Sequence, residues 1–431
     1  MRTNEQIAQQ VLSLLREQGA EGACSVSRTA KTELYYESGK IDMVRTNRNL
    51  SLSVKALKNQ KKGTSSVNSG DEASVRQAVA DALTAAEVAK EDAAEGLSES
   101  AAPKQFSVGP AAPDKDAMYR RFREFLDEVA RKYPTISFDS AGIEHDFSDD
   151  LYVNTNGVHY QTRQGGYGFS PMFMSKQGDR SSSFNYFGVT FREPSSPFLS
   201  LGNAAQTLED TEKQLNTRTL EGKFTGEVIF TPQCFEDLLG SVEGNFLSGG
   251  VLIDGTSIWK DKKETQVADG RLTWRSCPRS DEIAWGYFVT GDGYEARNMD
   301  IIQGGVLKNF VIGRYAAQKT GLPRSLSDGG CYVVDAGSDC LEDMIGSTGR
   351  GLLMNRFSGG APSSNGDITG VAKNSFLIEN GKVTDAVSEV MISGNLARML
   401  ADICAVSRER VNSGSSILPW VKIRGIVISG K

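Results

Sequence analysis

The strongest constraint on the fold comes from the segment DLYVNTNGVHYQTR, in which two alternating polar and apolar runs flank Asn156 and Gly157. Alternation with a period of two places the apolar side chains of a strand on one face. Asn-Gly is the preferred dipeptide of the type I′ turn that joins two antiparallel strands. The segment therefore predicts a β-hairpin in the first half of the chain.

Helices and further strands are predicted around this hairpin. Residues 4–18 and 118–129 carry apolar side chains at helical spacing, and residues 72–94 form an Ala-rich helical pattern. Residues 23–67 alternate instead and predict three or four strands. Because helices and strands are segregated along the chain, residues 1–220 are predicted to form an α+β domain, with helices packed on a mainly antiparallel sheet.

A second domain is predicted for residues 221–431, because strand-like patterns restart near residue 221 after a helix. Its first strand leads into a helix for which Thr231 is a suitable N-cap and Pro232 a suitable first residue. The rest is rich in glycine and short strands, which indicates a β-dominated domain, barrel-like or a sandwich, with a few helices. A Ser/Ala/Pro-rich stretch at about 96–113 predicts a surface loop in the first domain.

Histidine and cysteine usage limits metal chemistry. Only His145 and His159 occur among 431 residues, so a zinc centre with two or three histidine ligands would need both of them or ligands from another chain. The cysteines are scattered without a CxxC pair, which indicates free thiols in a reducing compartment. They are Cys24, Cys234, Cys277, Cys331, Cys340 and Cys404.

Charge and hydropathy give expectations about partners. With 48 Lys and Arg against 54 Asp and Glu, the formal charge is −6, which offers no electrostatic basis for direct contact with nucleic acid. The N-terminal residues lack the uninterrupted apolar stretch of a secretory signal, and no run of about 18 apolar residues follows. We therefore expect a cytoplasmic protein without membrane segments.

The residues alone reveal no catalytic constellation. No GxxxxGK[ST] loop, no GxGxxG after a strand and no GxSxG elbow occurs in the sequence. Carboxylates such as Glu236 and Asp237 are sequence neighbours, and neighbours point apart on a helix or strand. No cofactor site is predicted from these patterns.

The sequence does resemble one family, the TldD/PmbA family, formerly described as modulators of DNA gyrase and understood as a cytoplasmic metallopeptidase system. Seven segments in order carry the resemblance: VNTNG (153–157), FEDLLGSVEGNF (235–246), GGVLKNFVIGRYAAQKTG (304–321), SGG (358–360), NGDITG (365–370), FLIENGKV (376–383) and ISGN (392–395).

Catalytic members of this family, the TldD type, carry H-E-x-x-x-H on a helix, followed by a Glu-Gly-Asp-Phe-like stretch. The sequence EGNF at residues 243–246 fixes the register of this motif. The two histidine positions then fall on Phe235 and Gly240, and the catalytic glutamate position falls on Glu236. Neither phenylalanine nor glycine can bind zinc, and the stretch ERVNSGSSILP lacks the cysteine that the family places before a Ser-Leu-Pro-like segment.

In this respect the chain resembles the PmbA/TldE type, the non-catalytic member thought to pair with a TldD-type subunit. The resemblance implies that this chain holds no metal and no catalytic residue, that zinc belongs to the partner, and that extended or unfolded peptides are the substrates. Glu243, Asn245, Gly359 and Gly360 are then candidates for residues that face the peptide or the partner.

Two alternatives stay open from the sequence. The chain could be a homodimeric peptide-binding or regulatory protein, including the historical role as a gyrase modulator. It could also be a metal-independent hydrolase that uses His145 or His159 as a general base.

Overall fold

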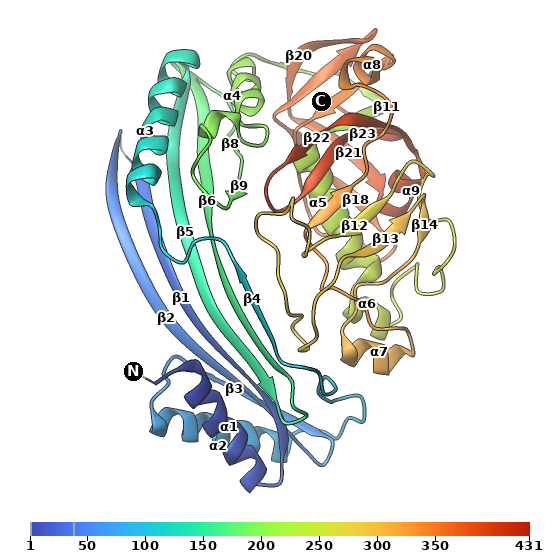
Figure 1. Cartoon of the computed structure of the whole chain (residues 1–431). Coiled ribbons are helices and arrows are strands. Elements are labelled where there is room, and N and C mark those ends of the chain that lie inside the picture. Colours follow the sequence, from blue (N-terminus) through green and yellow to red (C-terminus); the bar gives the residue numbers. More distant parts are fainter. Residues whose placement is uncertain (1, 38) are drawn as a thin grey trace.

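The structure is a computed structural model that describes residues 2–37 and 39–431, and it contains two large β-sheets with flanking helices (Figure 1). The first sheet is formed by strands up to residue 191, and the second by strands from residue 217 onward; the parts of the chain that carry these sheets are called the first and the second domain. Helices and strands are segregated as predicted, so the α+β class is confirmed.

The first sheet has the strand order β3-β2-β1-β5-β6-β4, with three short strands added to β6. Its pairs are antiparallel except β4 with β6. The strands are β1 (Glu21–Glu37), β2 (Lys40–Lys58), β3 (Lys61–Val67), β4 (Lys104–Val108), β5 (Ile136–Asn154), β6 (His159–Gln177), β7 (Arg180–Ser181), β8 (Asn185–Tyr186) and β9 (Val189–Phe191). The helices are α1 (Asn4–Glu17), α2 (Glu72–Val88), α3 (Lys115–Lys132), the 3₁₀ turn η1 (Phe198–Ser200) and α4 (Ala204–Lys213).

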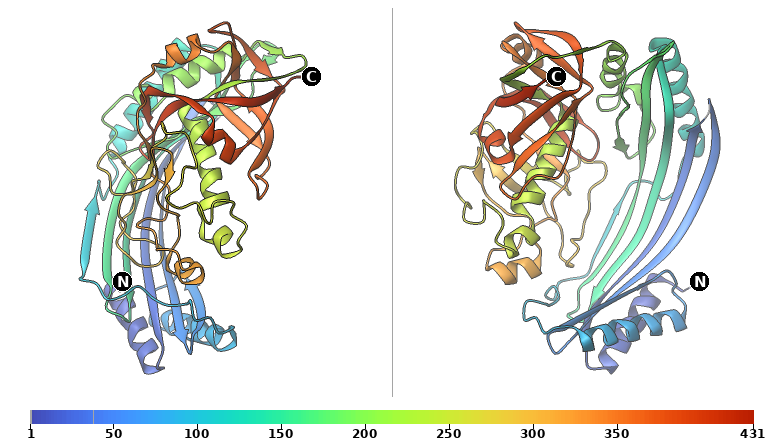
Figure 2. Two further views of the ribbon diagram at one scale, coloured as in Figure 1. Left: turned by 90° about the vertical axis from the view of Figure 1, so that its right-hand side faces the viewer. Right: turned by 180° about the vertical axis from the view of Figure 1, so that it is seen from behind.

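Two separate cores form on this sheet, one beneath α1 and α2 and the other beneath α3 and α4. In β1, Val26 belongs to the first core and Leu34 to the second. Eight residues separate them, and an even spacing along a strand keeps side chains on one face. The two helix pairs therefore cover the same face at opposite ends of the strands, as the views in Figure 2 also show.

The predicted hairpin exists, but its turn differs from the prediction. The loop between β5 and β6 spans residues 155–158, and only Gly157, at φ +97°, has a positive φ. A type I′ turn would need positive φ at Asn156 as well. Instead, the Asn154 side-chain oxygen accepts hydrogen bonds from the backbone N–H groups of Asn156 and Val158, both at 3.0 Å. This side chain closes the longer loop and thus fixes the register of the hairpin.

The segment at 96–113, predicted to be a surface loop, contains the five-residue strand β4 and contacts the second domain. Lys104 Nζ lies 2.6 Å from Glu295 Oε2. The ring of Phe106 stacks on that of Phe288 at 5.0 Å between centroids, with the Arg279 guanidinium over both. The segment therefore connects the two domains rather than lying free on the surface.

The second sheet is branched, and its main order is β10-β20-β19-β16-β11-β23-β15-β12-β13-β14. The described strands do not close into a barrel. They are β10 (Thr217–Thr219), β11 (Lys223–Phe230), β12 (Trp274–Ser276), β13 (Met299–Gln303), β14 (Val306–Leu307), β15 (Tyr332–Val334), β16 (Arg350–Met354), β17 (Arg356–Gly359), β18 (Asp367–Lys373), β19 (Ser375–Glu379), β20 (Lys382–Ser388), β21 (Val390–Asn395), β22 (Ile403–Asn412) and β23 (Ile417–Ser429). β23 pairs with β11, β15, β21 and β22.

Helices pack on both faces of this sheet. They are α5 (Pro232–Val242), the π-helical turn η2 (Glu243–Leu247), α6 (Gly249–Ile253), α7 (Arg314–Thr320), α8 (Leu341–Gly346) and α9 (Leu396–Ala401). α5 and α9 lie on one face and α8 on the other. Thr231 occupies the N-cap position of α5 and Pro232 its first position, as predicted, but the Thr231 hydroxyl donates to the carbonyl oxygen of Asn355 at 3.3 Å and makes no capping hydrogen bond to the helix. The apolar side chains of α5 are buried in the main core of the domain together with those of β23.

The structure also bears on the expectations about membrane segments and cysteines. Among residues 2–37 and 39–431, no helix has both the length and the apolar character needed to cross a bilayer. All six cysteines are free thiols in the structure. Cys404 lies on β22 and is half-buried, with its Sγ 3.5 Å from the carbonyl oxygen of Lys422.

Replacing Gly157 by alanine should destabilise the protein by about 1–2 kcal/mol, because a Cβ is disfavoured at positive φ. Urea unfolding of Gly157→Ala measures this loss. Gly349→Ala is the matched control, since Gly349 has no positive φ and a Cβ there contacts nothing within 4 Å. An equal effect of both substitutions would contradict the assigned turn.

Candidate functional site

Helix α5 contains the three positions of the degenerate motif, and these positions face in different directions. Phe235 is fully buried in the core of the second domain. Gly240 is exposed, and a Cβ built there contacts nothing within 4 Å. Five residues span about 500° on an α-helix, so positions 235 and 240 are rotated by roughly 140° from one another. The structure does not bring these two positions together on one face.

Glu236 lies on another face of α5 and meets a second segment of the chain. Its Oε2 accepts a hydrogen bond from Ser416 Oγ at 2.9 Å. Ser416 belongs to the turn between β22 and β23, within the stretch ERVNSGSSILP where the family would place a cysteine. The structure therefore brings the glutamate position and the third-ligand segment into contact, although they are far apart in sequence.

This turn is held firmly by backbone and side-chain contacts. The N–H of Gly414 donates to Asn412 Oδ1 at 2.7 Å, and the N–H of Ser416 donates to Ser413 Oγ at 3.1 Å. Gly414 has φ +85°, and a Cβ there would lie 1.8 Å from the carbonyl oxygen of Thr190 in β9. Only glycine allows this approach, so the turn is packed directly against the first domain.

A cavity of about 230 Å³ lies at this junction between the domains. The first domain contributes β8, β9 and the start of α4 to its wall, and the second contributes α5 and the β22–β23 turn. Its polar lining includes Asn185, Asn203, Thr207, Asp210, Thr231, Gln233, Glu236, Asp237, Asn355, Ser413, Ser415 and Ser416. This cavity is the candidate functional site.

Burial raises the pKa of three carboxylates in the wall, Glu236, Asp210 and Asp237. At Glu236 the hydrogen bond from Ser416 opposes this rise in pKa. Asp210 accepts hydrogen bonds from Gln206 at 2.8 Å and from Asn355 at 3.3 Å. The cavity therefore presents hydroxyl, amide and carboxyl groups to any ligand, without an imidazole or a thiol in its lining.

The remaining candidate residues lie beyond this cavity. Glu243, in η2, accepts a hydrogen bond from Tyr332 Oη at 3.0 Å, and burial raises its pKa. Asn245 Nδ2 donates to the carbonyl oxygen of Ser363 at 2.9 Å, which ties η2 to the loop after β17. Gly359 and Gly360 are exposed at the end of β17.

Both histidines lie in the first sheet, and neither lines the cavity. His145 is buried on β5, and its Nε2 is 3.0 Å from the carbonyl oxygen of Pro110. Burial lowers its pKa. His159 Nε2 lies 2.8 Å from Glu5 Oε1 at the start of α1. Each ring is thus paired with a group of the first domain.

The donor set around Glu236 does not fit a zinc centre. Zinc in peptidases takes imidazole, thiolate and carboxylate ligands, and the positions of the motif offer a benzyl side chain, a glycine and serine hydroxyls instead. Across the described part of the chain, no group of three or more His, Cys, Asp or Glu side chains converges suitably for a metal ion.

Sequence reasoning missed the residues that the first domain contributes. Asp210 and Asn185 carry no recognisable signal, because their role depends on how the two domains pack. Ser416 belongs to the stretch ERVNSGSSILP, in which the only feature considered was the missing cysteine. Its contact with Glu236 would have needed knowledge of the β22–β23 turn.

Comparison with known proteins places this geometry in context. A family model described as the PmbA/TldA metallopeptidase C-terminal domain matches residues 222–430, and one described as PmbA/TldA metallopeptidase domain 1 matches residues 23–86. The sequence is 24% identical to "Metalloprotease PmbA" of Escherichia coli O157:H7, over 94% of this chain and 92% of that protein.

Solved structures share the whole fold. TldE from Thermococcus kodakarensis aligns with a TM-score of 0.83 at 19% identity, covering 99% of both chains. A protein from Bacteroides thetaiotaomicron, described as a candidate modulator of DNA gyrase, aligns with a TM-score of 0.84 at 22% identity, covering all of both chains. At these identities the likeness concerns the fold alone.

The two degenerate ligand positions should respond to substitution with opposite signs. Gly240→Ala should stabilise the protein by about 0.5–1 kcal/mol, because an exposed glycine inside a helix carries an entropic cost. Phe235→Ala should cost about 3–5 kcal/mol, because it empties a fully buried position. Urea denaturation measures both changes, and a destabilised Gly240→Ala variant would contradict the open environment of this residue.

Glu236→Gln should change the pH dependence of stability. Because burial raises the pKa of Glu236, the folded state binds its proton more tightly than the unfolded state, and stability falls as pH rises through the carboxyl range. The Glu236→Gln side chain cannot ionise, so the variant does not lose stability in this way as pH rises. Its free energy of unfolding, relative to wild type, should therefore increase between about pH 4 and about pH 7.

Glu342→Gln, at an exposed position of α8, is the control for this measurement. A difference between Glu236→Gln and wild type that stays constant with pH, or that falls as pH rises, would contradict the raised pKa.

Proposed function

The chain belongs to the PmbA/TldD metallopeptidase family, and we propose that it acts in the cytoplasm as a PmbA/TldE-type subunit, which completes a peptidase without binding the metal itself. In this proposal a TldD-type partner holds the zinc, and the complex cleaves extended or unfolded peptides.

One observation carries the proposal. The helix of the motif and the turn after β22 meet at Glu236 and Ser416, where a catalytic relative would assemble its ligands. This contact supports the proposal, because the helix and the turn meet while Phe235, Gly240 and the serine-rich turn lack zinc-binding groups. A glutamate without a metal-bound water has no proton to take from it, so Glu236 is assigned no catalytic role.

In this proposal the chain forms part of the wall of the space in which the complex holds its peptide substrate. Among the described strands, β17 pairs only with β18, so its other edge has no strand partner next to Gly359 and Gly360. An extended peptide can pair with such an edge by β-augmentation. The polar cavity beside Glu236 offers further hydrogen-bonding groups at the junction of the domains.

Metal analysis and co-expression test the proposal together. The purified chain should contain far less than one zinc per molecule by plasma mass spectrometry. Co-expression with a TldD-type chain should give a stable complex that cleaves an unfolded peptide, whereas neither chain alone should do so. Stoichiometric zinc bound by this chain alone, or full activity without the partner, would overturn the proposal.

Variants of this chain separate the proposal from the alternatives. In the complex, Glu236→Gln and the double variant His145→Gln/His159→Gln should retain peptidase activity, because no catalytic step is assigned to these side chains. Loss of activity in a folded histidine variant would favour the metal-independent hydrolase. Sedimentation of the isolated chain tests the homodimer, which the proposal does not require.

A further inference from the structure

A second cavity, of about 180 Å³, lies between the first sheet and the start of α7, and its chemistry differs from that of the site at Glu236. It is lined by Ser25, Ser53 and Lys55 from the first sheet, by Glu95 and Gly96 from the connecting segment, and by Asp292, Arg314 and Tyr315 from the second domain. Ala23, Leu97, Tyr152 and Gly291 complete the lining.

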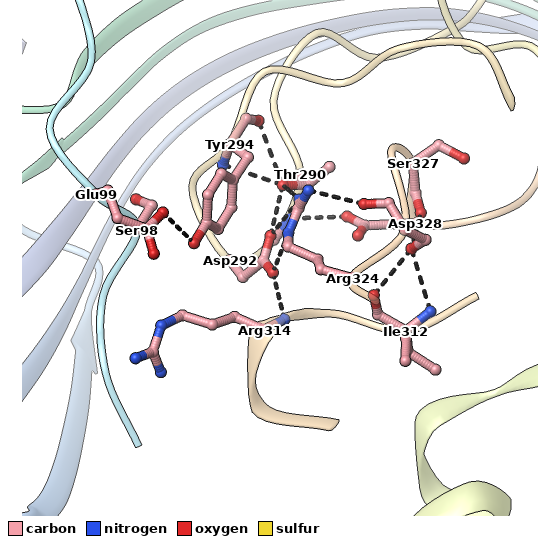
Figure 3. A network of polar contacts seen from close by, with 12 residues as sticks. Ser98, Glu99, Thr290, Asp292, Tyr294, Ile312, Arg314, Arg324, Ser327 and Asp328 are labelled. Atoms are coloured by element: carbon pink, nitrogen blue, oxygen red, sulfur yellow. Dashed lines mark hydrogen bonds and ion pairs between the residues drawn. The ribbon is translucent and has the colours of Figure 1, made fainter. Parts of the chain in front are cut away.

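Arg314 in this wall lacks a carboxylate partner for its side chain. Its backbone N–H donates to Asp292 Oδ2 at 2.7 Å, but the guanidinium extends away from Asp292 toward the segment that carries Ser98 and Glu99 (Figure 3). Asp292 is instead paired with Arg324, whose Nε and Nη2 each lie 2.9 Å from its oxygens. The negative charge of Asp292 is therefore neutralised by Arg324.

The contacts of the Arg314 guanidinium are incomplete. Nη1 donates to the carbonyl oxygen of Ala94 at 3.0 Å, whereas Nε is buried without a hydrogen-bond partner among the described residues. Gly96 packs on the guanidinium so closely that a Cβ there would lie 2.3 Å from its carbon. A buried cation with an unused donor is costly, and such groups are ordinarily paired.

The other charges around the cavity do not supply the missing partner. Glu95 is shared by Lys55, whose Nζ is 3.3 Å from its Oε2, and by Lys62. Asp92, nearby on the same segment, pairs with Lys319 at 2.8 Å. Lys55 and Lys62 thus share the carboxylate of Glu95, and Arg314 lies near that of Glu99, so that three cations and two carboxylates leave an excess of one positive charge.

The state of Lys55 is consistent with this excess. Burial lowers its pKa, Glu95 opposes the shift, and the positive charges of Lys62 and Arg314 lower it further. An anion bound in the cavity would offset the repulsion between these positive charges. Hydroxyl groups of Ser25 and Tyr152 in the same wall offer additional donors.

We propose that this cavity is a binding site for a small oxyanion, a carboxylate or a phosphate, held by Arg314 and Lys55. The planar fork of an arginine matches the oxygens of either group, and Arg314 and Lys55 lie in the wall of the same cavity. Because Lys55 lies on the first sheet and Arg314 on α7, the bound anion bridges the two domains. The site does not depend on the function proposed above.

Titration of the whole chain with inorganic phosphate tests this site. At constant ionic strength, phosphate should raise the melting temperature saturably and give a binding isotherm by calorimetry, whereas chloride should not. Arg314→Gln should weaken phosphate binding at least tenfold. Arg297→Gln, an exposed arginine of the same domain, should leave it unchanged.

The source of the oxyanion is distinguished by a second pair of probes. Tri-alanine with a free C-terminal carboxylate should compete with phosphate if the site takes a peptide terminus, whereas tri-alanine amide should not. Competition by neither peptide would assign the site to free phosphate. Lys55→Met replaces Arg314→Gln if circular dichroism shows that the latter is unfolded. Absence of saturable binding to wild type, or unchanged binding in a folded Arg314→Gln variant, would overturn the site.

Discussion

The continuous pairing of four long strands determines the rest of this structure. β1, β2, β5 and β6 contain 17 to 19 residues each and are hydrogen-bonded over most of their length. Nineteen residues at about 3.3 Å each span roughly 60 Å, which is longer than one helix pair can cover. Two helix pairs therefore pack at opposite ends, and the arched sheet reaches along one side of the second domain (Figures 1 and 2).

Both cavities follow from the way the second domain rests on this arch. At one end, Thr190 N–H donates to the carbonyl oxygen of Ser413, beside the cavity that contains Glu236. At the other end, Tyr294 Oη donates to Glu99 near the cavity that contains Arg314. Each cavity has walls from both domains, so its shape depends on their relative position. Polar contacts at the two ends hold that position.

Local signals in the sequence predicted the elements that depend on local chemistry. The amphipathic helices and the start of α5 at Thr231 and Pro232 were correct, because side-chain spacing and the fixed φ of proline act within a few residues. The hairpin was placed correctly, but the Asn154 side chain changed its turn. β4 pairs with a strand that follows it by some fifty residues, and Ser416 meets Glu236 across 180 positions. Only the assembled fold creates such contacts, so the site could be predicted as a set of degenerate positions and not as a cavity.

The central place of β23 also determines the order in which the chain acquires its structure during synthesis. The first sheet can form once residues up to about 191 have left the ribosome. β11 emerges soon afterwards, yet its antiparallel neighbour is β23, at residues 417–429. The apolar face of α5 therefore stays without its partner strand through most of the remaining translation. The burial of α5 thus depends on a strand that is made about 180 residues later.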